Sequence, residues 1–121
     1  LAVKAPIAIL GLSNGARAGL TGFVAGLSRD PGIVANNVPL NNILPGWFGT
    51  VRGQQALESL ATKHGLTLDQ ALVQRLQAIP AGRFGMPEEF GATCAFLCSR
   101  FTGYLTGQNI LLDGGEFRGT L

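Results

Sequence analysis

The stretch Val38–Thr50, V-P-L-N-N-I-L-P-G-W-F-G-T, decides the fold of this chain. The apolar side chains of Val38–Leu44 indicate a short β-strand. Pro45-Gly46 ends it, because proline fixes φ and glycine accepts positive φ. In an open α/β sheet, ligands bind just outside the carboxyl ends of the strands. The loop Pro45–Thr50 is therefore the first candidate for a binding site, although ordinary turns use the same residue types.

The composition indicates one domain whose surface is partly covered by something else. The chain has 121 residues, of which 46% are hydrophobic and 13% are charged, and it contains 18 glycines. The charged fraction is about half of the usual value for soluble domains. A partner subunit or another part of the same protein would cover such a surface. The chain starts without a methionine, which indicates a processed or truncated chain.

The charge pattern points away from nucleic acids and membranes. The net charge is +2, and the nine Lys and Arg residues form no basic run, so no nucleic-acid footprint is predicted. No apolar run reaches the roughly 18 residues that a membrane span needs. Leu1–Leu12 is apolar but contains Pro6 and lacks a basic n-region, so it does not read as a signal peptide. We expect neither a nucleic-acid nor a membrane partner.

The two cysteines, Cys94 and Cys98, are four residues apart and share one face of an expected helix. Two thiols without a third ligand make a poor zinc site, so no metal site is predicted. We expect both cysteines to be buried and to act as small hydrophobic residues. Free thiols predict a reducing, cytoplasmic compartment.

Helical spacing predicts a helix over Ser13–Asp30, which Pro31-Gly32 breaks, after a loop over Leu1–Gly11. Ser13 and Arg17 lie on one face of it, because they are four residues apart. One stripe of the helix is apolar and the next consists of glycines: Leu12, Ala16, Leu20, Phe23 and Leu27, then Gly15, Gly19, Gly22 and Gly26. Four glycines cost a helix about 3–4 kcal/mol relative to alanine. The pattern predicts a close approach by another helix or a ligand, the alternative being incidental small residues.

Three more helices and a second strand are expected after the loop. Val51–His64, closed by Gly65, and Leu68–Ala78, capped by Thr67, would form a lid or substrate loop over residues 51–80. His64 is expected to be a surface residue that suits the helix dipole. A helix then starts at Pro87 and ends near Ser99, and a strand follows over Asn109–Leu112. Helix, strand, helices, strand is the order of an α/β fold with a parallel, doubly wound sheet.

Four motifs follow one another in the order typical of one family. They are N-N-I-L-P-G-W-F-G-T (41–50), I-P-A-G-R-F-G-M-P-E-E-F (79–90), C-A-F-L-C-S (94–99) and Y-L-T-G-Q-N-I-L-L-D-G-G (104–115). Together they resemble the C-terminal half of short-chain dehydrogenases/reductases, in particular the 3-oxoacyl-carrier-protein reductases. The resemblance implies that residues 1–121 are a single partial Rossmann-type domain with NAD- or NADP-dependent carbonyl or alcohol chemistry.

The resemblance also implies a site and an assembly. Pro45, Gly46, Phe48 and Thr50 would line the nicotinamide pocket, and Trp47 would lie near the substrate. The substrate would be a small carbonyl or alcohol compound. The family builds dimers and tetramers through the last strand, the helix before it and the helix that carries Ser13 and Arg17, so a homo-oligomer is expected.

Two departures from the family pattern concern the chemistry. The glycine-rich phosphate loop is absent from this sequence, and Ser13-Asn14-Gly15-Ala16-Arg17 stands where the family has Y-x-x-x-K. Serine is a far weaker acid than tyrosine, whose pKa starts near ~10. Arg17 stays charged, with a pKa above ~12, and could hold a ribose hydroxyl or a phosphate. Ser13 and Arg17 are thus the candidate catalytic residues, and Arg17 is also a candidate cofactor ligand.

Three functions remain open at this point. The first is an oxidoreductase whose C-terminal part carries an altered active site, the 121-residue chain alone being inactive as a dehydrogenase. The second is a non-catalytic module of the same fold, used for assembly or ligand binding. The third is a hydrolase with Ser13 as the nucleophile, which needs a nearby base, and His64 is the only histidine.

Overall fold

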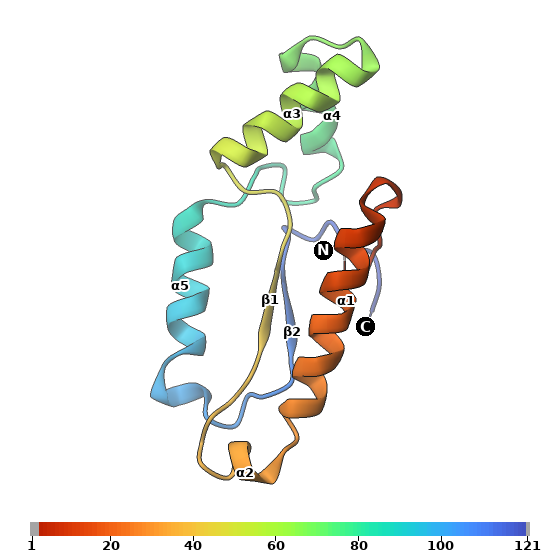
Figure 1. Cartoon of the computed structure of the whole chain (residues 1–121). Helices are drawn as coiled ribbons and strands as arrows, with labels where there is room; N and C mark the ends of the chain where they lie inside the picture. Colours follow the sequence, from red (N-terminus) through yellow and green to blue (C-terminus); the bar gives the residue numbers. More distant parts are fainter. Residues whose placement is uncertain (1–2, 121) are drawn as a thin grey trace. The chain divides into compact units, whose positions relative to one another are not determined.

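A computed structural model describes residues 3–120 of the chain (Figure 1). The chain forms two compact units. The first comprises Leu1–Leu44 and Gly91–Leu111, and the second comprises Pro45–Phe90 and Leu112–Leu121. Each helix of residues 3–120 is too short or too polar to span a membrane.

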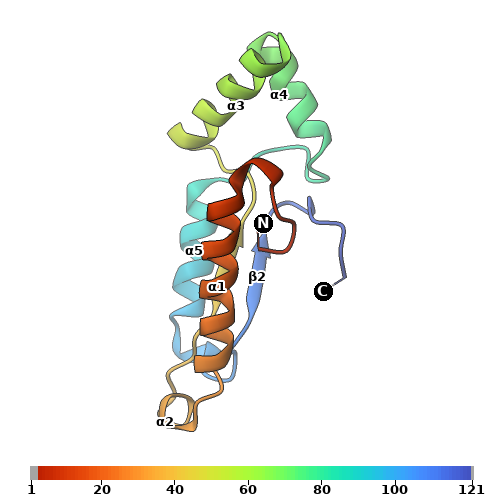
Figure 2. The same cartoon turned by 45° about the vertical axis from the view of Figure 1, so that its right-hand side comes forward.

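The strands β1 (Asn42–Pro45) and β2 (Asn109–Leu112) form a two-stranded sheet, and Figures 1 and 2 show them side by side. The Asn42 amide donates to the Gln108 carbonyl (2.8 Å), and the Gly46 amide donates to the Leu112 carbonyl (3.0 Å). Both partners advance by four residues in the same direction, so the strands are parallel. The predicted α/β fold with a parallel sheet is confirmed.

The first strand begins later than predicted, at Asn42 instead of Val38. The side chain of Asn41 takes the place of ladder bonds at this point. Its Nδ2 donates to the Leu105 carbonyl (2.6 Å), and its Oδ1 accepts from the Gln108 amide (3.0 Å). The Leu40 carbonyl still accepts from the Gly107 amide (2.7 Å), so the segment before β1 runs beside the segment before β2 without forming a regular ladder.

The long N-terminal helix α1 spans Gly11–Leu27, after a short 3-10 helix η1 (Ala8–Leu10) where a loop was predicted. Residues 1 and 2 of that predicted loop lie outside the described residues. The expected end at Asp30 is also wrong. Asp30 instead caps a new helix α2 (Pro31–Val34), with its Oδ1 accepting from the Gly32 amide (2.8 Å). Pro31 suits the first position of a helix, where no amide donor is needed.

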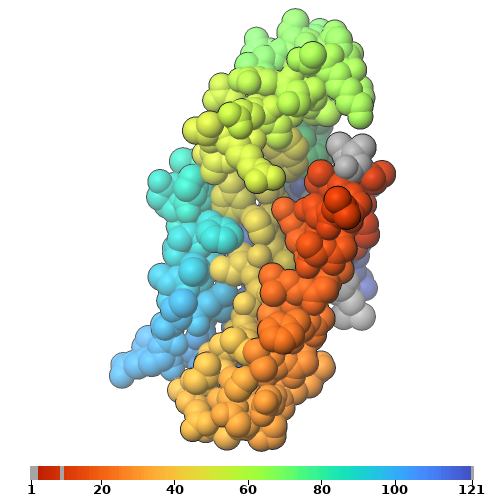
Figure 3. All heavy atoms as spheres, in the orientation of Figure 1, coloured from red at the N-terminus to blue at the C-terminus, as the bar shows by residue number. Residues whose placement is uncertain are grey.

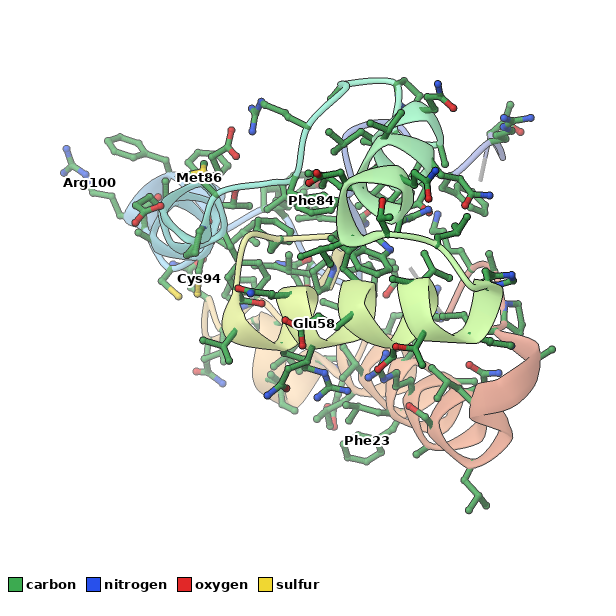
Figure 4. The ribbon with its side chains drawn as sticks, turned by 90° about the horizontal axis from the view of Figure 1, so that it is seen from above. Phe23, Glu58, Phe84, Met86, Cys94 and Arg100 are labelled. Carbon is green, nitrogen blue, oxygen red and sulfur yellow. The ribbon has the colours of Figure 1, made fainter. Side chains whose placement is uncertain are left out.

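The described chain leaves the glycine stripe of α1 and most of its apolar stripe uncovered. Leu12 is 95% exposed and Phe23 is 65% exposed. No atom of residues 3–120 beyond the helix backbone lies within 4 Å of a Cβ placed on any of the four stripe glycines. In Figure 3 the atoms of α1 (red to orange) lie open on the viewed face, and in Figure 4 the Phe23 ring projects outward from the helix. The predicted close approach is therefore not made within this part of the chain.

The helices α3 (Val51–His64) and α4 (Leu68–Gln77) form a hairpin in the second unit (Figure 1), and both were predicted to be helical. Gly65 ends α3 in the left-handed region with φ 63°, which glycine adopts at low cost. Thr67 caps α4 in a reciprocal capping box with Gln70. A small core lies between the helices, formed by Leu57, Ala61 and Ala71, with Trp47, Leu60, Leu66 and Leu72 packed against it.

The helix α5 (Pro87–Leu97) begins at the predicted proline, and η2 (Arg100–Thr102) follows it. Cys94 and Cys98 are free but exposed, so the prediction that they are buried is wrong. The physical reason is that the described chain leaves this helix largely uncovered: α5 has no buried residue, and Phe96 is 56% exposed.

Candidate functional site

The loop that follows β1 is held against the turn that follows β2. Both meet where Gly46 passes Asp113. A Cβ placed on Gly46 would lie 2.8 Å from both Cα and Cβ of Asp113, which is closer than real Cβ contacts. Gly46 therefore permits an approach that no other residue type allows, and it fixes the start of the predicted cofactor loop.

The middle of the loop is fixed by the glycine-rich connector at Gly85. The Gly85 amide donates to the Trp47 carbonyl, and the Gly49 amide donates to the Gly85 carbonyl, each at 2.9 Å. The Phe48 ring covers Gly85, where a Cβ would lie 2.7 Å from it, and it meets the Phe90 ring edge to face at 5.8 Å. The Phe48 side chain is thus used for packing.

The loop ends at the N-terminus of α3, which has the electrostatic character of an anion site. Thr50 is exposed and caps the helix, its Oγ1 accepting from the Gly53 amide (3.1 Å). The first turn contains Arg52 and no acidic residue. Helix N-termini carry a partial positive charge and free backbone donors, so they favour phosphates. The Thr50 hydroxyl keeps its hydrogen available for donation.

Trp47 joins this loop to the α3–α4 hairpin. It packs against the hairpin core and stacks on Phe84 (labelled in Figure 4) with ring centroids 5.7 Å apart. The guanidinium carbon of Arg75 lies 4.6 Å from the Trp47 ring centroid, within the range of a cation–π contact. Arg75 also forms an ion pair with Glu116. Sequence reasoning missed Arg75 and Glu116, because no local pattern links residues 41 positions apart.

An exposed ion pair closes the connector onto the start of α5. Arg83 Nη1 and Nη2 donate to the two carboxylate oxygens of Glu89 at 2.8 and 2.6 Å, and the Met86 amide donates to Glu89 Oε2 at 2.7 Å. The hydrogen bond from Arg83, followed by that from Met86, lowers the pKa of Glu89 to about 2. The same hydrogen bond raises the pKa of Arg83.

Glu89→Gln is expected to lower stability at neutral pH and to have a smaller effect at about pH 3. A carboxyl whose folded pKa lies below its reference value of 4.5 stabilises the fold above that value and stops doing so as the pH falls to about 2. The urea midpoints of both proteins, at neutral pH and about pH 3, measure this. Glu88→Gln is the matched control on the same turn. A midpoint difference that grows on acidification would contradict the assignment.

The predicted catalytic pair lies on α1, in the first unit. Ser13 is half-buried and Arg17 is exposed, and no residue among 3–120 pairs with the Arg17 guanidinium. Between them, Asn14 fixes the preceding turn, with Nδ2 donating to the Ile7 carbonyl (2.7 Å). Ser13 and Arg17 thus lie on one helix of the first unit. The other four predicted site residues lie together in one loop of the second unit: Pro45, Gly46, Phe48 and Thr50. His64, in the last turn of α3, is exposed and belongs to the second unit.

Comparison with known proteins places these features in a family. Residues 7–116 match the sequence profile of a family described as enoyl-(acyl carrier protein) reductase. NADPH-dependent reductase BacG from Bacillus subtilis (strain 168) is 35% identical over 86 residues, which are 71% of this chain and 33% of that protein. The 3-oxoacyl-[acyl-carrier-protein] reductase FabG from Aquifex aeolicus (strain VF5) is 34% identical over 101 residues, which are 84% of this chain and 36% of that protein.

A solved structure supports the same assignment. YwfH, an NADPH-dependent reductase involved in bacilysin biosynthesis, matches with a TM-score of 0.89 and 30% identity, over 98% of this chain and 44% of that one. The predicted Rossmann-type fold is confirmed by this match. The chain spans about a third of the length of each of the two curated relatives above.

Proposed function

We propose that this chain, which belongs to the short-chain dehydrogenase/reductase family, is the C-terminal part of an NAD(P)-dependent oxidoreductase that acts on a small carbonyl or alcohol compound. The observation that carries the proposal is the loop Pro45–Thr50. It lies at the carboxyl end of a parallel strand, packs against Asp113 and is hydrogen-bonded to Gly85. Such a strand end is where α/β sheets bind ligands. The relatives BacG and FabG, both named as reductases, support the reaction class.

Each residue of the loop has a distinct role in this proposal. Pro45 and Gly46 present flat backbone without bulky side chains to the nicotinamide ring. Phe48 contributes its backbone, because its ring packs on Gly85. Thr50 donates its hydroxyl hydrogen to the cofactor, and the N-terminus of α3 favours the cofactor's negative charge. The nicotinamide, when bound, supplies the hydride, and the chain's residues orient it.

Ser13 and Arg17 determine how well a proton reaches the substrate oxygen. Arg17, charged at every working pH, holds a ribose hydroxyl or a phosphate as a fixed donor. Ser13 occupies the place of a general acid but is too weak an acid to protonate an alkoxide efficiently at neutral pH. We therefore expect cofactor binding with slow reduction in the natural protein.

Replacing Thr50 with valine in the full-length gene product is expected to weaken NADPH binding by roughly 10–100-fold, because a hydrogen bond to a charged ligand contributes roughly 1.5–3 kcal/mol. Calorimetric titration with NADPH and with NADH measures the effect. Thr67→Val is the matched control, since it removes the cap of α4 in the same way. Equal dissociation constants for both variants, or no binding of either cofactor by the unmodified protein, would rule out this role of the loop.

The open faces of α1 and α5 support a homodimer or homotetramer. Leu12, Leu20 and Phe23 on α1 and Phe96 on α5 are large apolar side chains that residues 3–120 leave exposed. Contiguous exposed apolar side chains mark protein contacts. Multi-angle light scattering of the full-length protein should give the mass of two or four chains. A stable monomer over the whole concentration range would contradict this assembly.

A non-catalytic binding module is the second candidate, and the replacement of the family's tyrosine and lysine by Ser13 and Arg17 favours it. Such a module would bind NAD(P)H and turn over no carbonyl substrate, so the titration and a reductase assay together separate the two candidates. The free thiols Cys94 and Cys98 support a cytoplasmic location for either.

A further inference from the structure

An ion pair in the second unit ties the α3–α4 hairpin to the segment after β2. The Arg75 Nη2 atom on α4 contacts Glu116 Oε1, and these two side chains are only 14% and 15% exposed. The two residues are 41 positions apart, so the contact crosses from the hairpin to the end of the chain. Removing one partner of such a buried pair leaves the other charge unpaired and is strongly unfavourable.

The pair uses only part of its bonding capacity. Arg75 Nε and Glu116 Oε2 are both buried, and neither has a hydrogen-bond partner among the described residues. One is a donor and the other an acceptor, and they belong to the same two side chains. A bidentate guanidinium–carboxylate pair would satisfy both atoms, so the fork of Arg75 is suited to Glu116 in a way that lysine would not be.

At its other side Arg75 touches the candidate cofactor loop. Its guanidinium lies over Trp47, which stacks on Phe84, and the Trp47 carbonyl accepts from the Gly85 amide. Trp47 stands between Gly46 and Phe48, whose positions the site depends on. The orientation of the Trp47 ring is thus set by stacking on Phe84, by packing against the hairpin core and by Arg75, which supplies the only charged contact among the residues described.

Glu116 is itself held in a fixed turn that reaches the same loop. The two carboxylate oxygens of Asp113 accept from the Gly115 and Phe117 amides at 3.0 and 2.9 Å. Asp113 is also the residue that packs against Gly46. The pair therefore links two segments, α4 and the turn after β2, that both contact the loop.

We propose that Arg75 is a positioning residue for the substrate side of this site. Its pair with Glu116 holds the α3–α4 hairpin in place and sets the orientation of Trp47, so that a carbonyl substrate meets a fixed aromatic wall beside the nicotinamide loop. The role of Arg75 towards a substrate rests on the proposed function. Its role in holding the α3–α4 hairpin rests on its contacts alone.

The test uses Arg75→Met, Arg75→Lys and Glu116→Gln in the full-length gene product. In Arg75→Met, kcat/KM for an acetoacetyl thioester should fall by roughly 10–100-fold, because misplacing a group by about 1 Å has an effect of this size. The loss should appear as a higher KM. The dissociation constant for NADPH should not change. Arg75→Lys should recover part of the loss, because it keeps the charge opposite Glu116 without the fork. Arg100→Met, which removes another arginine lying over an aromatic ring, is the matched control.

Two further measurements need neither cofactor nor substrate. The emission of Trp47, isolated as the difference from Trp47→Phe, should shift in Arg75→Met and Glu116→Gln. Amide hydrogen exchange of residues 51–78 should become faster in both. Unchanged emission and exchange would overturn the proposal, and so would changed exchange with an unchanged kcat/KM, which would make the pair purely structural. A full-length protein that neither binds NAD(P)H nor reduces a carbonyl would overturn the proposed function and, with it, the substrate role of Arg75. Faster exchange in the two variants would in that case still show that the pair stabilises the hairpin.

Discussion

Replacing Ser13 with tyrosine and Arg17 with lysine together is expected to raise the rate of NAD(P)H-dependent carbonyl reduction by about 10²–10⁴-fold, the usual contribution of a general acid. The two positions are four residues apart on α1, so both new side chains occupy one helix face. A tyrosine beside a lysine is an acid whose pKa can be tuned towards neutrality, whereas the serine hydroxyl cannot be. Single-turnover assays on the full-length protein measure the gain.

The matched control is the double variant Ser13→Phe with Arg17→Lys. It introduces the same ring without the hydroxyl, so it should not raise the rate above that of the unmodified protein. A gain in this variant equal to that in the tyrosine variant would show that packing, and not proton transfer, had changed. No gain in either variant would favour the non-catalytic binding module.

Replacing Gly46 with alanine is expected to have the second largest effect. The new Cβ would lie 2.8 Å from Asp113 Cα, a backbone atom that no side-chain rotation can move away. Overpacking of this kind costs about 1–3 kcal/mol of stability. The loop must also shift, so kcat/KM should fall by roughly 10²-fold. Urea unfolding and steady-state kinetics on the same protein measure both effects.

Gly49 provides the control on the same loop. A Cβ placed there would be 3.8 Å from the nearest atom, the Gly85 carbonyl oxygen, which is an ordinary contact. Gly49→Ala should therefore leave stability and kinetics close to those of the unmodified protein. Similar losses in both variants would mean that the loop needs flexible glycines in general, and not the close approach of Gly46 to Asp113.

The parts of the fold that local chemistry controls could be predicted from the sequence. Gly65 ends α3 and Thr67 caps α4, because both signals act within a few residues of the position that they determine. The strand Asn109–Leu112 and the proline that starts α5 were predicted for the same reason. The family motifs added the cofactor and substrate roles expected of the loop at the end of β1.

Features that depend on distant residues could not be predicted in this way. The burial expected for Cys94 and Cys98 depended on a cover for α5 that the described chain does not supply. The start of β1 depended on the Asn41 side chain bonding to residues more than sixty positions away. No periodicity or motif in the sequence predicts the Arg75–Glu116 pair, because it forms only when the α3–α4 hairpin meets the segment after β2.

Hydrogen exchange of the full-length protein with and without NADPH tests the central claim most directly, because it reports on the backbone of the loop itself. We predict that NADPH slows the exchange of amides in residues 46–53 and leaves those of α4 largely unchanged. Saturating NADPH with no protection of residues 46–53 would place the cofactor elsewhere and would contradict the assignment of this loop as the nicotinamide side of the site.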